Sequence, residues 1–197
     1  EALAGAVIGI FKADETEFTA EHAFMTVKSG EDGSFAFKKV PYGNWIVKEI
    51  EAPEGFVLDG TAHAVTIDQN KQVIEVEITN EYIHGNIRLT KVDADYPDNK
   101  LTGATFEVYK DVNGDGKLDD KDELVGNLEE TSVGIYEMQE LLYGKYFVKE
   151  TKAPEGFVLD GNVYPVSIEE NGKTYIVENE AGKGFLNEAQ KGSLKIV

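Results

Sequence analysis

The chain has 197 residues, with 41% hydrophobic and 28% charged residues and a net charge of −18 at pH 7. This length suits two domains of about 100 residues, each able to bury its own core. The negative charge argues against nucleic acids and anionic membranes as partners, and the lack of cysteine excludes disulfides and thiol catalysis. The sequence shows no apolar run of transmembrane length and no signal-peptide pattern.

One stretch occurs twice, at residues 47–60 (VKEIEAPEGFVLDG) and 148–161 (VKETKAPEGFVLDG), with twelve of fourteen positions identical. A repeat at this long spacing indicates two copies of a whole domain. The matched segments expected to form strands are, in chain order, 3–11 and 101–109, 32–35 and 133–136, 45–49 and 146–150, 64–67 and 165–168, and 73–80 and 175–187. Short strands between Gly-, Pro- and Asp-rich turns, without helical periodicity, predict an all-β fold of two tandem β-sandwiches.

Three polar residues of the second copy end the apolar stripes of their strands: Lys91, Glu150 and Asn187. Glu49 and Asn80 occupy the matching positions of the first copy. Burying an ionised carboxylate is costly unless it is paired, hydrogen-bonded or neutralised. Either the pleat ends at each glutamate and the side chain reaches solvent, or these side chains meet inside the sandwich.

If the three side chains meet, they can react with one another. Burial lowers the pKa of a lysine and raises that of a carboxylic acid, so such a pair can be a neutral amine and a neutral acid. A neutral amine is a nucleophile. A protonated Glu150 could donate a hydrogen bond to the side-chain carbonyl of Asn187 while Lys91 Nζ attacks, and loss of ammonia would leave an amide. The alternative is a buried Lys–Glu ion pair without a covalent bond.

Four segments carry a family resemblance. LTKVD at 89–93, KLTGATF at 100–106, VKETKAPEGF at 148–157 and FLNE at 185–188 resemble the CnaB-type (collagen-adhesin B-type, prealbumin-like) domains of Gram-positive surface adhesins and sortase-assembled pilins. The Glu-x-x-Ala-Pro-x-Gly segment resembles the pilin E box. The resemblance covers nearly the whole chain.

This resemblance implies prealbumin-like, Ig-like sandwiches and an isopeptide bond between Lys91 and Asn187, promoted by Glu150. It also implies an extracellular, cell-wall-attached location and a structural role as a stalk or shaft. The implied partners are neighbouring repeats of the same polypeptide. Any binding to host extracellular matrix would occur through other domains. The cross-linking reaction occurs once, so we do not expect an enzyme with turnover.

The first copy departs from this pattern because no lysine strand precedes its first matched strand. Residues 192–197 (GSLKIV) match residues 85–90, the start of the lysine strand. We therefore expect a window from a longer tandem array. It would comprise a sandwich lacking its first strand at 1–83, a sandwich with an inserted calcium loop at 84–190, and the start of the next repeat at 191–197.

No bond is expected in the first copy, because the nearest lysine, Lys12, lies beyond the matched strand. The alternative is that a neighbouring molecule donates the missing strand, for example through its own tail.

Residues 111–122 (DVNGDGKLDDKD) fit the template of a twelve-residue calcium loop. Gly116 falls at position 6, where a sharp turn is needed. The oxygen ligands expected at positions 1, 3, 5, 7, 9 and 12 are Asp111, Asn113, Asp115, the carbonyl of Lys117, Asp119 and Asp122. Asp122 stands where glutamate is usual, as in the dockerin-type loops that this segment resembles. The alternative to a Ca²⁺ site is an acidic turn stabilised by Gly and Asn alone.

A stalk module has two rival function classes. An enzyme is disfavoured because the three histidines are scattered and no hydrolase, metalloprotease or phosphate-binding motif occurs. The main alternative to a stalk module is an adhesive module that binds host matrix protein or glycan through sandwich loops. Its candidate contacts are the tyrosines expected to be exposed, Tyr42, Tyr82, Tyr96 and Tyr143.

Overall fold

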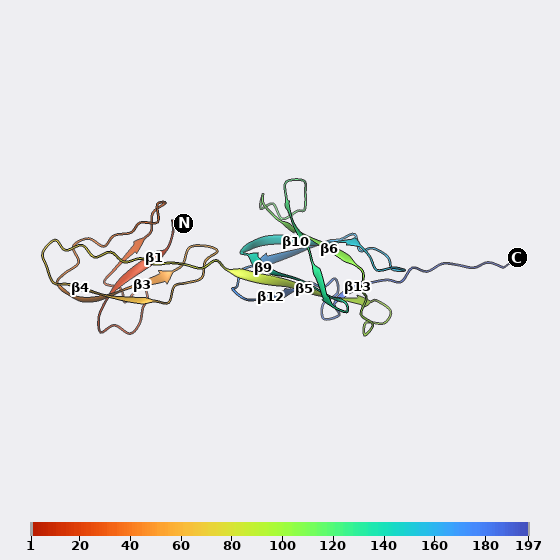
Figure 1. Ribbon diagram of the computed structural model, residues 1–197, viewed down its shortest axis with the longest axis horizontal. Helices are drawn as coiled ribbons and strands as arrows, with labels where there is room; N and C mark the ends of the chain where they lie inside the picture. The colour runs from red at the N-terminus through yellow and green to blue at the C-terminus, as the bar shows by residue number, and fades with distance from the viewer. Residues whose placement is uncertain (1, 197) are drawn as a thin grey trace. The chain divides into compact units, whose positions relative to one another are not determined.

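The computed structural model describes residues 2–196, which form thirteen strands and no helix (Figure 1). The all-β prediction is therefore confirmed. The chain divides into two compact units, the first ending at Tyr82 and the second beginning at Ile83. None of the described residues forms a helix that could span a membrane.

The second unit contains two sheets. The first is antiparallel, and its strands in spatial order are β11 (Val163–Ile168), β10 (Gly144–Lys152), β6 (Thr105–Lys110) and β7 (Glu123–Asn127). The second runs through β12 (Thr174–Ile176), β5 (His84–Asp93), β9 (Ile135–Leu142) and β8 (Glu129–Ser132), and β13 (Phe185–Asn187) also pairs with β5. Because β12 and β13 both run parallel to β5, the last strands of the unit lie beside its first.

Alternation along these strands builds the core of the second unit. Ile87 and Leu89 from β5 are fully buried, as are Phe106 from β6 and Phe185 from β13. The ring of Phe106 makes edge-to-face contacts with the rings of Tyr136 and Phe185, at centroid distances of 5.2 and 5.0 Å. These contacts join the two sheets and hold β13 against the interior.

The first unit contains one ladder, with the order β2 (Met25–Lys28), β1 (Val7–Lys12), β3 (Gly43–Glu51) and β4 (Ala62–Ile67). This order matches β7-β6-β10-β11 of the second unit. The apolar side chains of residues 35–40 and 76–78 still pack on this sheet.

The sequence predicts a strand that begins at residues 32–35 and another that covers residues 73–80. Both predictions are wrong, because neither segment forms a strand. Their counterparts in the second unit, β9 and β12 with β13, all pair with β5. Residues 2–82 provide no counterpart of β5, so the backbone groups of both segments lack the ladder partner that defines a strand.

Candidate reactive cluster

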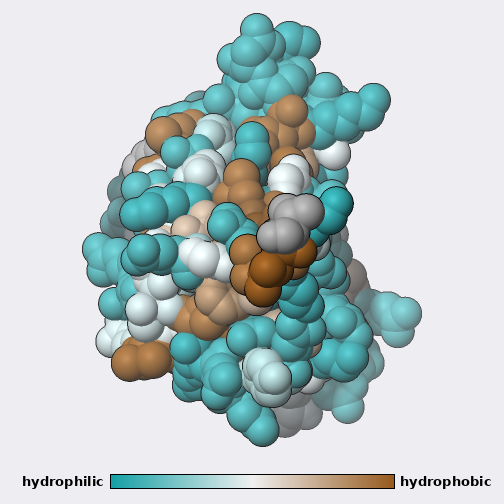
Figure 2. All heavy atoms as spheres, turned by 90° about the vertical axis from the view of Figure 1, so that its right-hand side faces the viewer, coloured by the Kyte–Doolittle hydropathy of each residue, from teal (hydrophilic) through white to brown (hydrophobic). Residues whose placement is uncertain are grey.

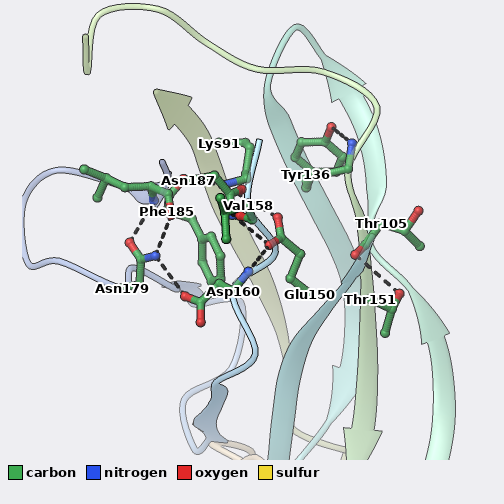
Figure 3. A network of polar contacts seen from close by, with 12 residues as sticks. Lys91, Thr105, Tyr136, Glu150, Thr151, Val158, Asp160, Asn179, Phe185 and Asn187 are labelled. Atoms are coloured by element: carbon green, nitrogen blue, oxygen red, sulfur yellow. Dashed lines mark hydrogen bonds and ion pairs between the residues drawn. The ribbon is translucent and has the colours of Figure 1, made fainter. Parts of the chain in front are cut away.

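Lys91, Glu150 and Asn187 meet inside the second unit, from β5, β10 and β13 respectively (Figure 3). Their exposed fractions are 0%, 0% and 3%. Lys91 Nζ lies 3.6 Å from Glu150 Oε1, and Asn187 Nδ2 donates to Glu150 Oε2 at 2.9 Å. The carboxyl group therefore lies between the amine and the carboxamide.

A local irregularity of the strand follows the glutamate in both copies. The pairing of β10 with β6 shifts register between Glu150 and Lys152, and the pairing of β3 with β1 shifts in the same way after Glu49. A β-bulge interrupts the alternation of side chains at that point. Each glutamate is thus the last inward-pointing residue of a regular stripe, and it is buried, with 1% of Glu49 exposed.

The environment of Lys91 shifts its equilibrium toward the neutral amine. Burial lowers the pKa of Lys91 from 10.5 to about 8, although the charge of Glu150 acts in the opposite direction. Nζ donates one hydrogen bond, to the backbone carbonyl of Phe185 at 3.0 Å, and lies 4.9 Å from the centre of the Phe185 ring. Near pH 8 half of such groups carry a free lone pair, which a nucleophile needs.

The two oxygens of Glu150 have different surroundings. Oε2 accepts from the backbone N–H of Asp160 at 2.8 Å as well as from Asn187. Oε1 makes no hydrogen bond with the described residues and faces only Lys91 Nζ. One oxygen is thus placed to accept a proton from the amine, while the other already contacts the nitrogen that would leave.

The carboxamide of Asn187 points the opposite way from the sequence-based expectation. Its Nδ2 faces Glu150 and also donates to the carbonyl of Val158 at 2.6 Å, while Oδ1 is buried and has no hydrogen-bond partner among residues 2–196. The carbonyl of Val158 can only accept, so it requires the nitrogen on that side. The expected hydrogen bond from a protonated Glu150 to the Asn187 carbonyl oxygen is therefore not formed in this arrangement.

A second group of side chains fixes β13, and the sequence reasoning missed it. Asn179 accepts from the backbone N–H of Leu186 and donates to its carbonyl, both at 2.7 Å, and donates to Asp160 at 3.0 Å. Burial acts to raise the pKa of Asp160, but hydrogen bonds from Asn179 and Tyr164 outweigh it and hold that pKa below its ordinary value. Figure 3 shows this chain of contacts leading to the strand that carries Asn187. The sequence offered one signal for this group, namely that Asp160 belongs to the repeated segment. It offered none for Asn179, because that residue lies in a loop that only the second copy has.

Glycine is required where β13 approaches β5. Gly184 has a φ of +91°, and a Cβ atom there would lie 2.8 Å from the carbonyl oxygen of Thr90. Only glycine combines this backbone conformation with so close an approach.

The first unit repeats half of the cluster. Glu49 Oε2 accepts from the backbone N–H of Asp59 and from Asn80 Nδ2, both at 2.7 Å, and Asn80 also donates to the carbonyl of Val57 at 2.9 Å. Glu49 Oε1 is buried without a hydrogen-bond partner among the described residues. Lys12 lies at the exposed end of β1. Within residues 2–196 the structure therefore places Glu49 with Asn80, and no lysine donates a hydrogen bond to Glu49 Oε1.

The candidate calcium loop joins β6 to β7, whose end residues Lys110 and Glu123 pair. Asp111 accepts from the backbone N–H groups of Gly114 at 2.7 Å and Gly116 at 3.1 Å, and Gly116 has a φ of +75°. These turns match the template. The carboxylates do not converge, however, because nowhere in residues 2–196 do three or more acidic or histidine side chains gather to hold a metal ion.

The amide nitrogen of Asn113 lies between two of the expected ligands. It is 3.2 Å from Asp115 Oδ2 and 3.4 Å from Asp119 Oδ2. Asp122 instead accepts from the backbone N–H groups of Asp119 at 2.9 Å and Val112 at 3.3 Å. The predicted ligands therefore lie on one loop, where the Asp111 and Asp122 carboxylates accept hydrogen bonds from backbone N–H groups of the same loop.

The chain resembles known proteins over both units. A family model described as the SpaA prealbumin-like fold domain matches residues 1–82 and 85–183. No curated protein matches the chain. Among solved structures, the Bacillus anthracis TIE protein is 28% identical, with a TM-score of 0.75, over 96% of this chain and 31% of that one. The chain thus spans about a third of the length of that protein.

Two further solved structures are pilins. GBS52, the minor pilin of Streptococcus agalactiae, is 21% identical over 100% of this chain and 87% of that one, with a TM-score of 0.43. BcpA, the major pilin subunit of Bacillus cereus, is 17% identical over 96% of both chains, with a TM-score of 0.41.

Proposed function

Because the chain belongs to the family of SpaA prealbumin-like fold domains, we propose that it is a structural stalk module of a cell-wall-anchored Gram-positive surface protein. In this proposal the module lies outside the cell, neighbouring repeats of the same polypeptide are its partners, and an isopeptide bond between Lys91 and Asn187 stabilises its second unit. The observation that carries the proposal is the buried contact of Glu150 with both the amine and the carboxamide.

The reaction follows from these contacts. The neutral amine of Lys91 attacks the side-chain carbonyl carbon of Asn187, and Glu150 Oε1 accepts the proton that Nζ loses. The carboxyl group then donates a proton to Nδ2, with which Oε2 is already hydrogen-bonded. The bond from the carbonyl carbon to Nδ2 breaks, ammonia leaves, and an amide joins the two side chains.

Proximity and burial favour this otherwise slow aminolysis. Holding reactants in place replaces a bimolecular encounter by a unimolecular step. Lys91 and Asn187 come from two strands that already lie side by side. Lys91 of β5 is paired with Phe185 of β13, and Phe185 precedes Asn187 by two residues. The reaction consumes its own side chains, so no turnover follows.

The test is an intact mass measured under denaturing conditions. The wild-type chain should be lighter than its sequence mass by one ammonia, and Lys91→Met, which keeps a long unbranched side chain without the amine, should have its full sequence mass. A wild-type chain at its full sequence mass would contradict the proposed bond.

We also propose that the loop at 111–122 binds Ca²⁺ through Asp111, Asn113, Asp115, the carbonyl of Lys117, Asp119 and Asp122. The support is the sequence template together with the turn at Gly116 and the hydrogen bonds that Asp111 accepts across that turn. Hard oxygen ligands such as these favour Ca²⁺. Its role would be to stiffen the hairpin between β6 and β7.

Scanning calorimetry with Ca²⁺ and with a chelator tests the metal site. Calcium should raise the melting temperature of the wild-type chain, since a ligand that binds only the folded state stabilises it. Asp119→Asn should abolish this shift, and Asp120→Asn, a neighbouring acidic residue outside the ligand set, should retain it. An equal melting temperature with and without Ca²⁺ would rule the site out.

A further inference from the structure

The sequence contains two Asn-Gly dipeptides, Asn113-Gly114 between β6 and β7 and Asn171-Gly172 between β11 and β12. In such a dipeptide the glycine nitrogen can attack the side-chain carbonyl carbon of the asparagine, because the two groups are held close and no glycine side chain shields the nitrogen. Both asparagines are exposed, and both glycines have a similar φ, +71° and +74°, with open space where a Cβ atom would stand. The dipeptides therefore differ only in their hydrogen bonds.

The hydrogen bonds around Asn113 favour the attack. The backbone N–H of Gly114 donates to Asp111 Oδ1 at 2.7 Å, so a carboxylate faces the proton that the nitrogen must lose. Asn113 Oδ1 accepts from the backbone N–H of Asp115 at 3.0 Å, and this donor can stabilise the charge that develops on the oxygen. The nitrogen that would leave, Nδ2, has only long contacts, with Asp115 Oδ2 at 3.2 Å and Asp119 Oδ2 at 3.4 Å.

The carboxylate that faces Gly114 is held in place by the sheet. Asp111 is 9% exposed, and its backbone N–H donates to the carbonyl of Lys145 in β10 at 2.9 Å. Residues 112–117, in contrast, are all exposed. Figure 2 shows a hydrophilic lobe at its upper edge, where the connection from β6 to β7 lies in Figure 1. Water can therefore reach Asn113 while the acceptor beside it stays fixed.

The hydrogen bonds around Asn171 oppose the same attack. The backbone N–H of Gly172 donates to the carbonyl of His84 at 2.7 Å, and a carbonyl, unlike a carboxylate, does not take up the proton. Asn171 Oδ1 accepts from the backbone N–H of His84 at 3.0 Å. These two bonds tie the dipeptide to the first residue of β5, and both would have to open before the nitrogen could react.

We propose that Asn113 is a site of spontaneous modification, at which reaction with Gly114 and water converts the side-chain amide to a carboxylate, whereas Asn171 is protected. Gly114 N forms a bond to the side-chain carbonyl carbon of Asn113, and the bond from that carbon to Nδ2 breaks. The proton of the Gly114 N–H passes through Asp111 Oδ1 to the departing nitrogen, which leaves as ammonia. Water then opens the five-membered succinimide ring at either of its carbonyl carbons, giving aspartate or isoaspartate at position 113.

This reaction requires neither the cross-link nor bound calcium, so it is independent of the proposed function. It adds a negative charge to a loop that is already acidic. Calcium loops carry either asparagine or aspartate at the third position, so the aspartate product would retain the oxygen ligands proposed for the metal.

Peptide mapping by mass spectrometry tests the proposal on the full chain, kept folded in mildly alkaline buffer with a calcium chelator. The peptide with Asn113 should gain the mass difference between a hydroxyl and an amino group and should separate into aspartate and isoaspartate forms. It should convert at least about tenfold faster than the peptide with Asn171, where two hydrogen bonds must open first. In guanidinium chloride the two peptides should convert at similar rates, because only the shared dipeptide then acts.

Asp111→Asn tests the role of the carboxylate. The amide oxygen can still accept from Gly114 but takes up no proton, so conversion of Asn113 in the folded chain should slow about tenfold or more. Asp120→Asn, which removes an exposed charge from the same loop, should leave the rate unchanged.

Equal rates at Asn113 and Asn171 in the folded chain would overturn the proposal, as would an Asn113 peptide that stays unmodified there. A folded-state rate that Asp111→Asn does not change would overturn it as well.

Discussion

Glu150→Gln should leave the second unit folded but without its cross-link. The glutamine carbonyl can still accept from the backbone N–H of Asp160 and from Asn187 Nδ2, as Oε2 does. Its amide nitrogen would stand where Oε1 faces Lys91, and an amide nitrogen does not accept a proton from an amine. The change therefore removes the proton transfer while it preserves the shape and most hydrogen bonds.

The size of the effect follows from the positions of the two linked residues. Lys91 and Asn187 are 96 positions apart, and in the chain-entropy model a cross-link of that span stabilises the folded state by about 5 kcal/mol. The same span sets the length of chain hidden from a stretching force. At roughly 3.3–3.6 Å per residue, the enclosed loop would release on the order of 300 Å of additional extension in the variant.

Three measurements on the same protein report these effects. Intact mass shows whether ammonia was lost, denaturant titration gives the free energy of unfolding, and single-molecule stretching from the two termini gives the released length. Glu49→Gln is the matched control, because Glu49 makes the same Oε2 contacts in the first unit, while its Oε1 has no hydrogen-bond partner among the described residues. That control should keep the lower mass and the short extension.

The reasoning fails if Glu150→Gln retains the loss of ammonia, or if wild type and Glu150→Gln release the same length under force. Either result would mean that this carboxyl group does not promote a bond between β5 and β13.

Three further predictions concern the same unit. The first follows the mass of the denatured, unlinked chain as it refolds at different pH values. The rate of cross-linking should rise about tenfold per pH unit below pH 8 and level off above it, since protonated Lys91 has no free lone pair. A rate that does not change between pH 6 and 9 would contradict this. Asn179→Ala should slow the same reaction by freeing β13, whereas Asn162→Ala, an exposed contact of Asp160, should not. Gly184→Ala should lower the unfolding free energy by more than about 1 kcal/mol in denaturant titration, because its backbone conformation disfavours a side chain; a change below that would show that β13 can move away.

The sequence was informative wherever a local pattern fixes the outcome. Alternation put Glu49 and Glu150 on the apolar faces of their strands, and both are buried. The long repeat predicted two units with the same strand order, which β2-β1-β3-β4 and β7-β6-β10-β11 share. These features depend on residues that are neighbours in the chain, so one sequence suffices to recognise them.

Other features depended on partners that the local sequence does not name. Residues 73–80 have the alternation of a strand, yet they form none, because residues 2–82 contain no strand that pairs with them. The orientation of the Asn187 amide was set by the carbonyl of Val158, 29 positions away. Asn179 was missed because its role depends on two contacts, with Leu186 and Asp160, that only the folded loop creates.

The sequence by itself determined the strand pattern, the division into two copies and the burial of an acid within each, because side-chain alternation and repetition are properties of the covalent chain. Only the tertiary structure decided which nitrogen and oxygen atoms face one another, and which segments become strands. Hydrogen bonds between strands join residues far apart in sequence, so a strand and a reactive cluster both exist only when their distant partners are in place.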